Sequence, residues 1–238
     1  MKYVFCMLMA GLLGMQSQLS AQALSYVDPA ISYQRILLEK SGEGSYKQIG
    51  NFKVIGTPYL YGNSFKGNVY TPAEKAENAD ISYNTYNQQV EVVQSGATKP
   101  LMMSLQDVDS FKLIIKDKNG TPEVLSFINA SQVDKSKKLF MQEVYNGKRF
   151  SLLKAYSSTM GYVSTNYVQS ELRQFDLIVD YYYFDVQKPG IKKLKISAKN
   201  LKSEFSSVAD ISAITSGDDF EKNTEFALKE IFALLNSK

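Results

Sequence analysis

Two Asn-Gly pairs, Asn119-Gly120 and Asn146-Gly147, constrain the fold of this chain more than any other feature. Each pair stands between two runs rich in β-branched and aromatic residues: "FKLII" precedes "EVLSFI", and "LFMQEVY" precedes "RFSLLKAY". Asn and Gly tolerate the left-handed backbone that tight hairpin turns require. The two hairpins predict an antiparallel meander and a mainly β fold, forming a sandwich or a partly closed barrel.

Strand patterns continue on both sides of these hairpins. The stretch "ISYNTYNQQVEVV" alternates and turns at Asn87-Gln88, and "FDLIVDYYYFDVQKPGIKKLKI" reads as two strands around Pro189-Gly190. Alternate residues of a strand share one face. Five residues of the latter stretch therefore lie together: Phe175, Leu177, Val179, Tyr181 and Tyr183.

The pattern changes to a helical one from Ser197 onward. "SAKNLKSEF" predicts a short helix and "SGDDFEKNTEFALKEIFALLNSK" a longer one, in which Ser216 and Asp219 have the spacing of a capping box. Glu225 and Lys229 are four residues apart, as in a helical ion pair. An apolar stripe, which we expect to pack against the sheet, follows from Ala227, Leu228, Ile231, Leu234 and Leu235.

The N-terminus has the layout of a secretory signal peptide. Lys2 precedes an apolar run that ends near Met15, and the small residues of Ala21-Gln22-Ala23 predict cleavage after Ala23, with a cut after Ala21 as the alternative. The chain thus divides into a signal peptide (1–23), a lead-in that can form a short helix (24–50), an antiparallel β domain (51–196) and a C-terminal helical segment (197–238). We expect an exported protein that is periplasmic, associated with the outer membrane, or secreted.

Two absences restrict the chemistry. Signal cleavage removes Cys6, the only cysteine, and the chain has no histidine. Ser-His-Asp and Cys-His catalysis need an imidazole, and zinc or copper sites almost always use His or Cys. Carboxylate chemistry, oxygen-ligated calcium, Ser-Lys sites or no catalysis remain open. The net charge of +3 comes from scattered basic residues, so we predict no nucleic-acid partner. No window after the N-terminal apolar run has about 18 continuous apolar residues, so we predict no transmembrane helix.

The order of several strand segments resembles a known family. "TPYLYGNSFKGNVYT", "ADISYNTYNQQVEV", "VDSFKL", "FMQEVYNGKRFSLLKAY" and "DYYYFDV" are followed by a helical end. This arrangement is similar to a family of uncharacterised exported proteins of Gram-negative bacteria, from Phe52 to about Leu235. The resemblance implies an exported all-β body with a helical end. It implies no activity and no site residues, and the sequence departs most from the family between Ser157 and Ser170.

Two tyrosine-rich stretches are candidate binding elements. In "GTPYLYGNSFKGNVYT", residues 56–71, the glycines predict a turn around Phe65, and this structural interpretation is favoured over an aromatic ligand platform built on Tyr59 and Tyr61. The stretch "YSSTMGYVSTNYVQ", residues 156–169, predicts a long polar loop. Long loops are often functional, so the best candidate recognition element is this loop, with Tyr156, Tyr162 and Tyr167.

Candidate catalytic and metal-binding residues are few. "QDVDS" places Asp107 and Asp109 on one face of a predicted strand, which could pair two carboxylates, although a solvated face is the favoured interpretation. "DKNGTPE" has oxygen ligands for calcium but lacks the EF-hand spacing, so it favours a hairpin turn. We therefore predict no catalytic residue, no metal site and no cofactor.

These observations predict a non-enzymatic exported envelope protein with a binding or structural role. Its partner would be an envelope protein, a lipid or a glycan. The alternative is a carboxylate-dependent hydrolase acting on glycans, which the exported setting and the scattered Asp residues leave open.

Overall fold

The computed structural model describes residues 53–62, 64–94, 96–97, 99–117, 119–162, 172–217 and 219–237. The predicted signal peptide, its cleavage site and the lead-in with its short helix lie outside the described residues.

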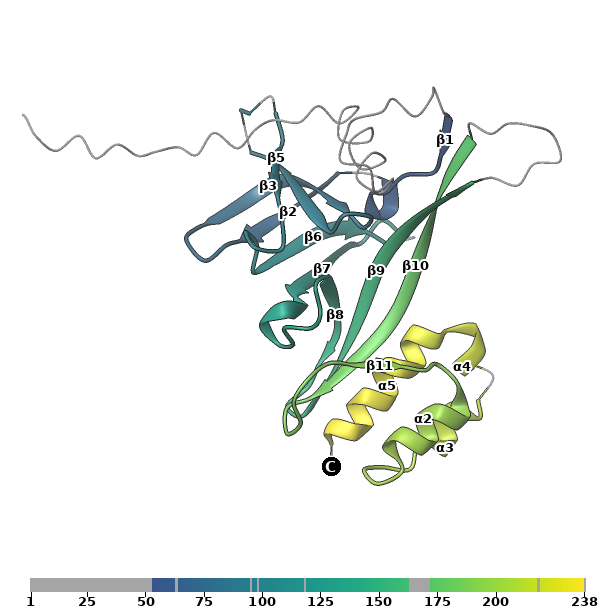
Figure 1. Ribbon diagram of the computed structural model, residues 1–238. Coiled ribbons are helices and arrows are strands. Elements are labelled where there is room, and N and C mark those ends of the chain that lie inside the picture. Colours follow the sequence, from purple (N-terminus) through teal and green to yellow (C-terminus); the bar gives the residue numbers. More distant parts are fainter. Residues whose placement is uncertain are drawn as a thin grey trace, which may run out of the picture.

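Eleven strands of the described residues form one sheet, ordered β1-β10-β9-β8-β7-β6-β2-β3-β4-β5, with β11 on β10. All pairs are antiparallel except β1 with β10. The sheet bends strongly but is not closed into a barrel (Figure 1). The strands are β1 (Lys53–Ile55), β2 (Phe65–Tyr70), β3 (Lys75–Asn84), β4 (Gln89–Val93), β5 (Leu101–Met103), β6 (Ser110–Lys116), β7 (Pro122–Asn129), β8 (Phe140–Asn146), β9 (Phe150–Tyr162), β10 (Leu172–Asp185) and β11 (Lys192–Leu194).

The predicted hairpins account for most of this order. Strands β6 to β10 follow one another as a meander, with turns at both Asn-Gly pairs. In the β6–β7 turn Gly120 has φ +81°, and Asp117 Oδ1 accepts from the backbone N–H groups of Asn119 (2.8 Å) and Thr121 (2.7 Å). Gln88 and Gly190 likewise have positive φ in the other predicted turns. The predicted mainly antiparallel β fold with C-terminal helices is confirmed.

The helices follow the strands, apart from two 3₁₀ turns. They are η1 (Leu60–Gly62), η2 (Ala130–Gln132), α2 (Ala198–Phe205), α3 (Ser212–Thr215), α4 (Asp219–Lys222) and α5 (Thr224–Asn236). The long helix predicted from Ser216 is interrupted at Asn223, whose side chain accepts from Phe226 N and begins α5. Asn is among the strongest N-cap residues, so it starts a new helix within an otherwise helical pattern.

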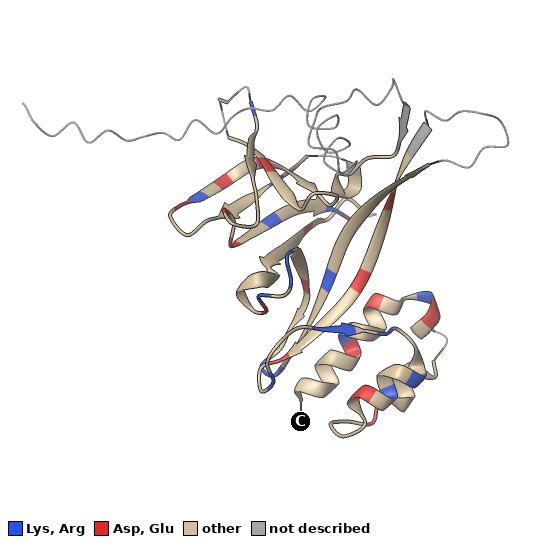
Figure 2. Ribbon diagram, in the orientation of Figure 1, with Lys and Arg blue, Asp and Glu red and all other residues tan. Residues whose placement is uncertain are grey.

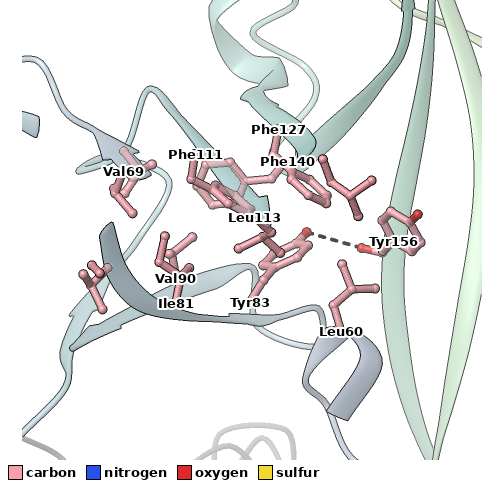
Figure 3. Packing of buried hydrophobic residues seen from close by; sticks show 14 residues of the cluster. Leu60, Val69, Ile81, Tyr83, Val90, Phe111, Leu113, Phe127, Phe140 and Tyr156 are labelled. Atoms are coloured by element: carbon pink, nitrogen blue, oxygen red, sulfur yellow. Dashed lines mark hydrogen bonds between the residues drawn. The ribbon is translucent and has the colours of Figure 1, made fainter. Parts of the chain in front are cut away.

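Two large hydrophobic cores lie along the β9–β10 hairpin. The first, the sheet core, sits inside the bend of β2 to β8, where Tyr83, Phe111, Phe127 and Phe140 pack ring against ring (Figure 3). The second, the helix core, lies between β8–β11 and the C-terminal helices (Figure 1). Its α5 residues include Ala227, Leu228, Ile231 and Leu235, with Leu234 partly buried. The predicted apolar stripe therefore packs against the sheet.

The turn predicted around Phe65 is wrong, because Phe65 begins β2. Gly67 lies inside this strand, at a register shift between β2 and β3. A Cβ atom at Gly67 would overlap the carbonyl oxygen of Lys112 on β6. The glycine therefore permits a close approach of β2 and β6. Rules that associate glycine with turns do not recognise this role.

Candidate functional site

A polar cluster separates the two cores on one face of the β9–β10 hairpin. Along β9, Leu152 belongs to the helix core and Tyr156 to the sheet core. Lys154 lies between them with the same side-chain parity, opposite Tyr181 of β10. We call this cluster the seam and define it by Tyr61, Gln142, Lys154, Tyr156, Tyr181 and Glu225.

An ion pair ties the sheet to α5 at the seam. Lys154 Nζ lies 2.6 Å from Glu225 Oε2, and the Tyr181 hydroxyl donates to the same oxygen at 3.1 Å. Lys229 Nζ lies 3.4 Å from Glu225 Oε1, so the helical pair expected from the spacing is present. Lys154 Nζ also lies 5.2 Å and 5.7 Å from the ring centroids of Tyr156 and Tyr181, within the range of cation–π attraction.

The charged state of Glu225 is favoured despite its environment. Burial acts to raise the pKa of Glu225, but the hydrogen bond and charge of Lys154, the charge of Lys229 and the Tyr181 hydroxyl outweigh it. The pKa of the carboxyl therefore lies below its usual value. Glu225 is an ionised acceptor at neutral pH and has no proton to give as a general acid.

Two tyrosines of the seam, Tyr156 and Tyr181, remain protonated. Burial raises the pKa of Tyr156, and its hydrogen bond with Tyr61 adds to the effect. Burial also raises the pKa of Tyr181, and the nearby Glu225 carboxylate acts in the same direction. The Tyr156 hydroxyl donates to Gln142 Oε1 at 2.7 Å and lies 3.2 Å from the Tyr61 hydroxyl. These phenols act as fixed hydrogen-bonding groups.

Tyr61 connects the seam to the surface. Its side chain is 47% exposed, and its ring packs edge-on against Phe65 and Tyr156, with centroids 6.3 Å apart in each case. Its backbone has φ +56°, a left-handed conformation that is costly for a tyrosine and that clusters at functional positions in proteins. The fold thus holds an aromatic ring at the surface in a fixed orientation.

Two apolar residues of β10 extend this surface. Leu177 and Val179 have the side-chain parity of Tyr181 and lie opposite Ser158 and Tyr156 of β9. They are 47% and 41% exposed, whereas Phe175, at the end of the same row, is buried. We call Tyr61, Leu177 and Val179 the apolar patch.

The structure brings together two of the five predicted site tyrosines, Tyr61 and Tyr156. Tyr59 has a different role: its hydroxyl donates to Glu91 Oε1 of β4 at 2.7 Å. Tyr162 ends β9, and its side chain lies outside the described residues, as does all of Tyr167.

The predicted loop over residues 156–169 is wrong in its first half. Residues 156–162 belong to β9, where they pair with residues 173–179 of β10. Serine and threonine read as loop residues in isolation, but here a long partner strand supplies hydrogen bonds to the whole segment. Residues 163–169 lie outside the described part of the chain.

Sequence reasoning missed four residues of the seam: Gln142, Lys154, Tyr181 as a hydrogen-bond donor, and Glu225 as a partner of the sheet. One signal was present. In "FSLLKAY" a lysine occupies the face that Phe150, Leu152 and Tyr156 make apolar. A cation in an otherwise apolar row predicts a buried partner, although its identity depends on the tertiary fold.

The candidate carboxylate pair is not on a strand face. Asp107 lies in a turn before β6, where its Oδ2 accepts from Ser104 N (2.8 Å) and Ser104 Oγ (2.6 Å). Asp109 accepts a hydrogen bond from Gln132 Nε2. The Asp107 carboxylate thus stabilises its own turn, and the Asp109 carboxylate contacts η2. Across the described residues, no cluster of three or more His, Cys, Asp or Glu side chains could hold a metal ion.

Glu91 is a buried carboxyl whose environment favours the protonated form. It is 9% exposed, and burial raises its pKa, while the hydrogen bond from Tyr59 acts in the opposite direction. A raised pKa is the property that a general acid needs. The position of Glu91 next to the Tyr59 hydroxyl is the feature that a hydrolase interpretation would use.

Charges are dispersed over the rest of the molecule. Basic and acidic residues are scattered over the strands and helices, and the short strand β11 is mostly basic (Figure 2). Among the helices in the described part of the chain, none has the length and apolar character needed to cross a membrane.

Comparison with known proteins finds no matching family model, no matching curated protein and no matching solved structure. The resemblance to exported proteins of Gram-negative bacteria stays a prediction.

Proposed function

We propose that this protein is a non-enzymatic exported envelope protein that binds a partner protein through the apolar patch. The N-terminal sequence supports export to the periplasm or the outer membrane. The observation that carries the binding role is the exposure of Tyr61, Leu177 and Val179 beside a seam whose polar groups are already paired.

The chemistry of the seam favours binding over catalysis. Glu225 is ionised and engaged by Lys154 and Tyr181, and Tyr156 is engaged by Gln142. No carboxyl of the seam combines a raised pKa with access to solvent, the combination that general acid catalysis requires. An exposed aromatic ring with a hydroxyl at its edge, next to aliphatic side chains, is typical of protein-binding surfaces.

A partner protein fits the patch better than a lipid or a glycan. Aliphatic Leu177 and Val179 offer no hydrogen bonds to a sugar, and aromatic sugar platforms favour tryptophan, which the chain lacks. A lipid chain on the patch would remove water from the neighbouring charged seam without replacing its hydrogen bonds, which costs free energy. A protein partner can place polar groups at the rim of the interface and so avoids this cost.

The test is native mass spectrometry of the protein recovered without detergent from the envelope of the cells that produce it. We expect a reproducible complex with one protein partner, lost when Leu177 and Val179 are changed to Ser. Val124→Ser is the matched control, because Val124 is an exposed valine of β7, outside the patch. A bare monomer in every preparation, or equal loss of the complex with Val124→Ser, would contradict the proposal.

The alternative function, a carboxylate-dependent glycan hydrolase, rests on the raised pKa of Glu91. It predicts turnover of some glycan that Glu91→Gln abolishes while the melting temperature is retained. Absence of turnover across a broad glycan panel would exclude it. The burial of Glu91 behind Tyr59 makes it the weaker of the two proposals.

A further inference from the structure

The outer edge of β10 is open between two short strands. Strand β9 pairs with β10 along one edge, from Arg173 to Asp185. On the opposite edge β1 pairs with residues 172–174 and β11 with residues 181–183. No strand among the described residues pairs with the interval 176–180 along this edge. Five residues of extended chain span about 17 Å, the length of a typical strand.

Both neighbouring strands leave the edge at the borders of this opening. After β1 the chain turns away at Gly56, which has φ +79° and lies close to the carbonyl oxygen of Phe175. After β11 the chain bends at residues 195–197, where Ser197 N bonds to Lys195 O, and Ser197 then caps α2. Local turn and cap geometry thus end both strands before they reach residues 176–180.

The side chains in the middle of the open interval are apolar, as in a buried strand, but they are exposed at the surface. Leu177, Ile178 and Val179 are each more than 40% exposed, and they alternate between the two faces of the sheet. An exposed apolar edge that no neighbouring strand covers is a template for the addition of another strand.

Charges flank the apolar interval. Asp176 is exposed and accepts from Gln174 Nε2 at 2.6 Å, and Asp180 pairs with Lys193 Nζ at 2.8 Å. A second copy of this chain, centred on the same interval, would place aspartates opposite aspartates in both parallel and antiparallel register. Like charges in direct cross-strand positions are destabilising. A segment with basic residues at those positions would instead be attracted.

We propose that residues 176–180 of β10 bind an extended segment of the partner protein as an added strand. The segment has apolar residues opposite Leu177, Ile178 and Val179, and Lys or Arg opposite Asp176 and Asp180. This inference rests on the proposed function, because Leu177 and Val179 also belong to the apolar patch, and it specifies how the partner is held.

The experiment uses isotope-labelled protein purified after export and the synthetic peptide TKVIVKT, blocked at both ends. We expect the backbone amides that point to the open edge in 176–180 to shift in NMR spectra and to gain protection from hydrogen exchange. The peptide TEVIVET should bind about tenfold more weakly, because two cross-strand pairs become repulsive. TKVIVKT with N-methyl groups on its bonding edge controls for contacts made by side chains alone.

A charge exchange gives the decisive comparison. Asp176→Lys combined with Asp180→Lys should reverse the preference, so that TEVIVET binds about tenfold more tightly than TKVIVKT. Unchanged amides in 176–180, or equal binding of both peptides before and after the exchange, would overturn the edge inference. If the native complex still depends on Leu177 and Val179 in that case, the proposed function stands without it. If no complex forms either, both proposals fail.

Discussion

The sheet core and the helix core cover the same face of one hairpin by different means. Near Tyr156 the bent sheet covers itself: the β3–β4 turn reaches β9, where Ser158 N bonds to Thr85 O at 3.1 Å and the two hydroxyls lie 2.6 Å apart. Near Leu152 the helices supply the cover. Between the two the hairpin keeps a polar seam and an exposed patch. An exposed apolar surface therefore remains where neither way of covering the sheet extends.

The largest expected effect tests whether the two cores unfold together. Phe127→Ala in the sheet core and Phe232→Ala in the helix core each remove a fully buried ring. Each should lower the free energy of unfolding by about 3–5 kcal/mol. Since β9 contributes to both cores, we expect one shared transition in urea denaturation followed by circular dichroism.

Phe226→Ala is the matched control, because Phe226 lies on α5 but is 53% exposed. Its effect should stay within about 0.5 kcal/mol. Two separate transitions in Phe232→Ala, with the sheet unfolding at its original denaturant concentration, would show that the helix core is an independent unit.

The second prediction concerns the attachment of the helices to the sheet. Asn236 Oδ1 accepts from Arg149 N (2.9 Å) and Phe150 N (3.0 Å), and its Nδ2 donates to Phe150 O (2.9 Å). Asn236→Ala leaves these backbone groups unpaired and should cost about 1–3 kcal/mol in urea denaturation. Ser237→Ala removes one exposed hydroxyl and should cost less than about 0.5 kcal/mol. Equal effects would contradict this attachment.

The third prediction is a pH dependence that originates at the seam. The pKa of Glu225 is lower in the folded protein than its ordinary value of 4.5. Its contribution to stability is therefore complete above pH 4.5 and is lost as the pH falls through the folded pKa. Glu225→Gln should be less stable than the wild type at pH 7, with the difference shrinking below pH 4.5. A pH-independent difference in melting temperature would contradict this assignment.

The smallest effect is expected at Asp134, a half-buried residue between β7 and β8. Hydrogen bonds from Ile191 N (3.0 Å) and from Ser136 Oγ and N lower the pKa of Asp134 to about 2. Its stabilising contribution is therefore complete above pH 3.8 and is lost as the pH falls from there through about 2. NMR titration of the carboxyl carbon should give this value, and Ser136→Ala should raise it towards 3.8. A wild-type value near 3.8 would contradict the hydrogen-bond assignment.

Local sequence signals predicted the hairpins well because the information lies within a few residues. Asn119-Gly120 and Asn146-Gly147 mark turns whose flanking strands pair with each other, so no distant contact is needed. The same rules failed at Gly67, because the reason for that glycine is Lys112 on another strand. They failed again from Ser157 to Tyr162, where pairing with β10 outweighs a loop-like composition.

By itself the sequence determined the antiparallel strands, their tight turns and the apolar stripe of α5, since each depends on periodicity or turn chemistry within one segment. Only the tertiary structure decided the seam. Tyr61 and Tyr156 are 95 residues apart, and Lys154 and Glu225 are 71 residues apart, so no local pattern joins them. The opening on β10 was decided in the same way, because an edge is defined by where β1 and β11 stop rather than by the residues of β10.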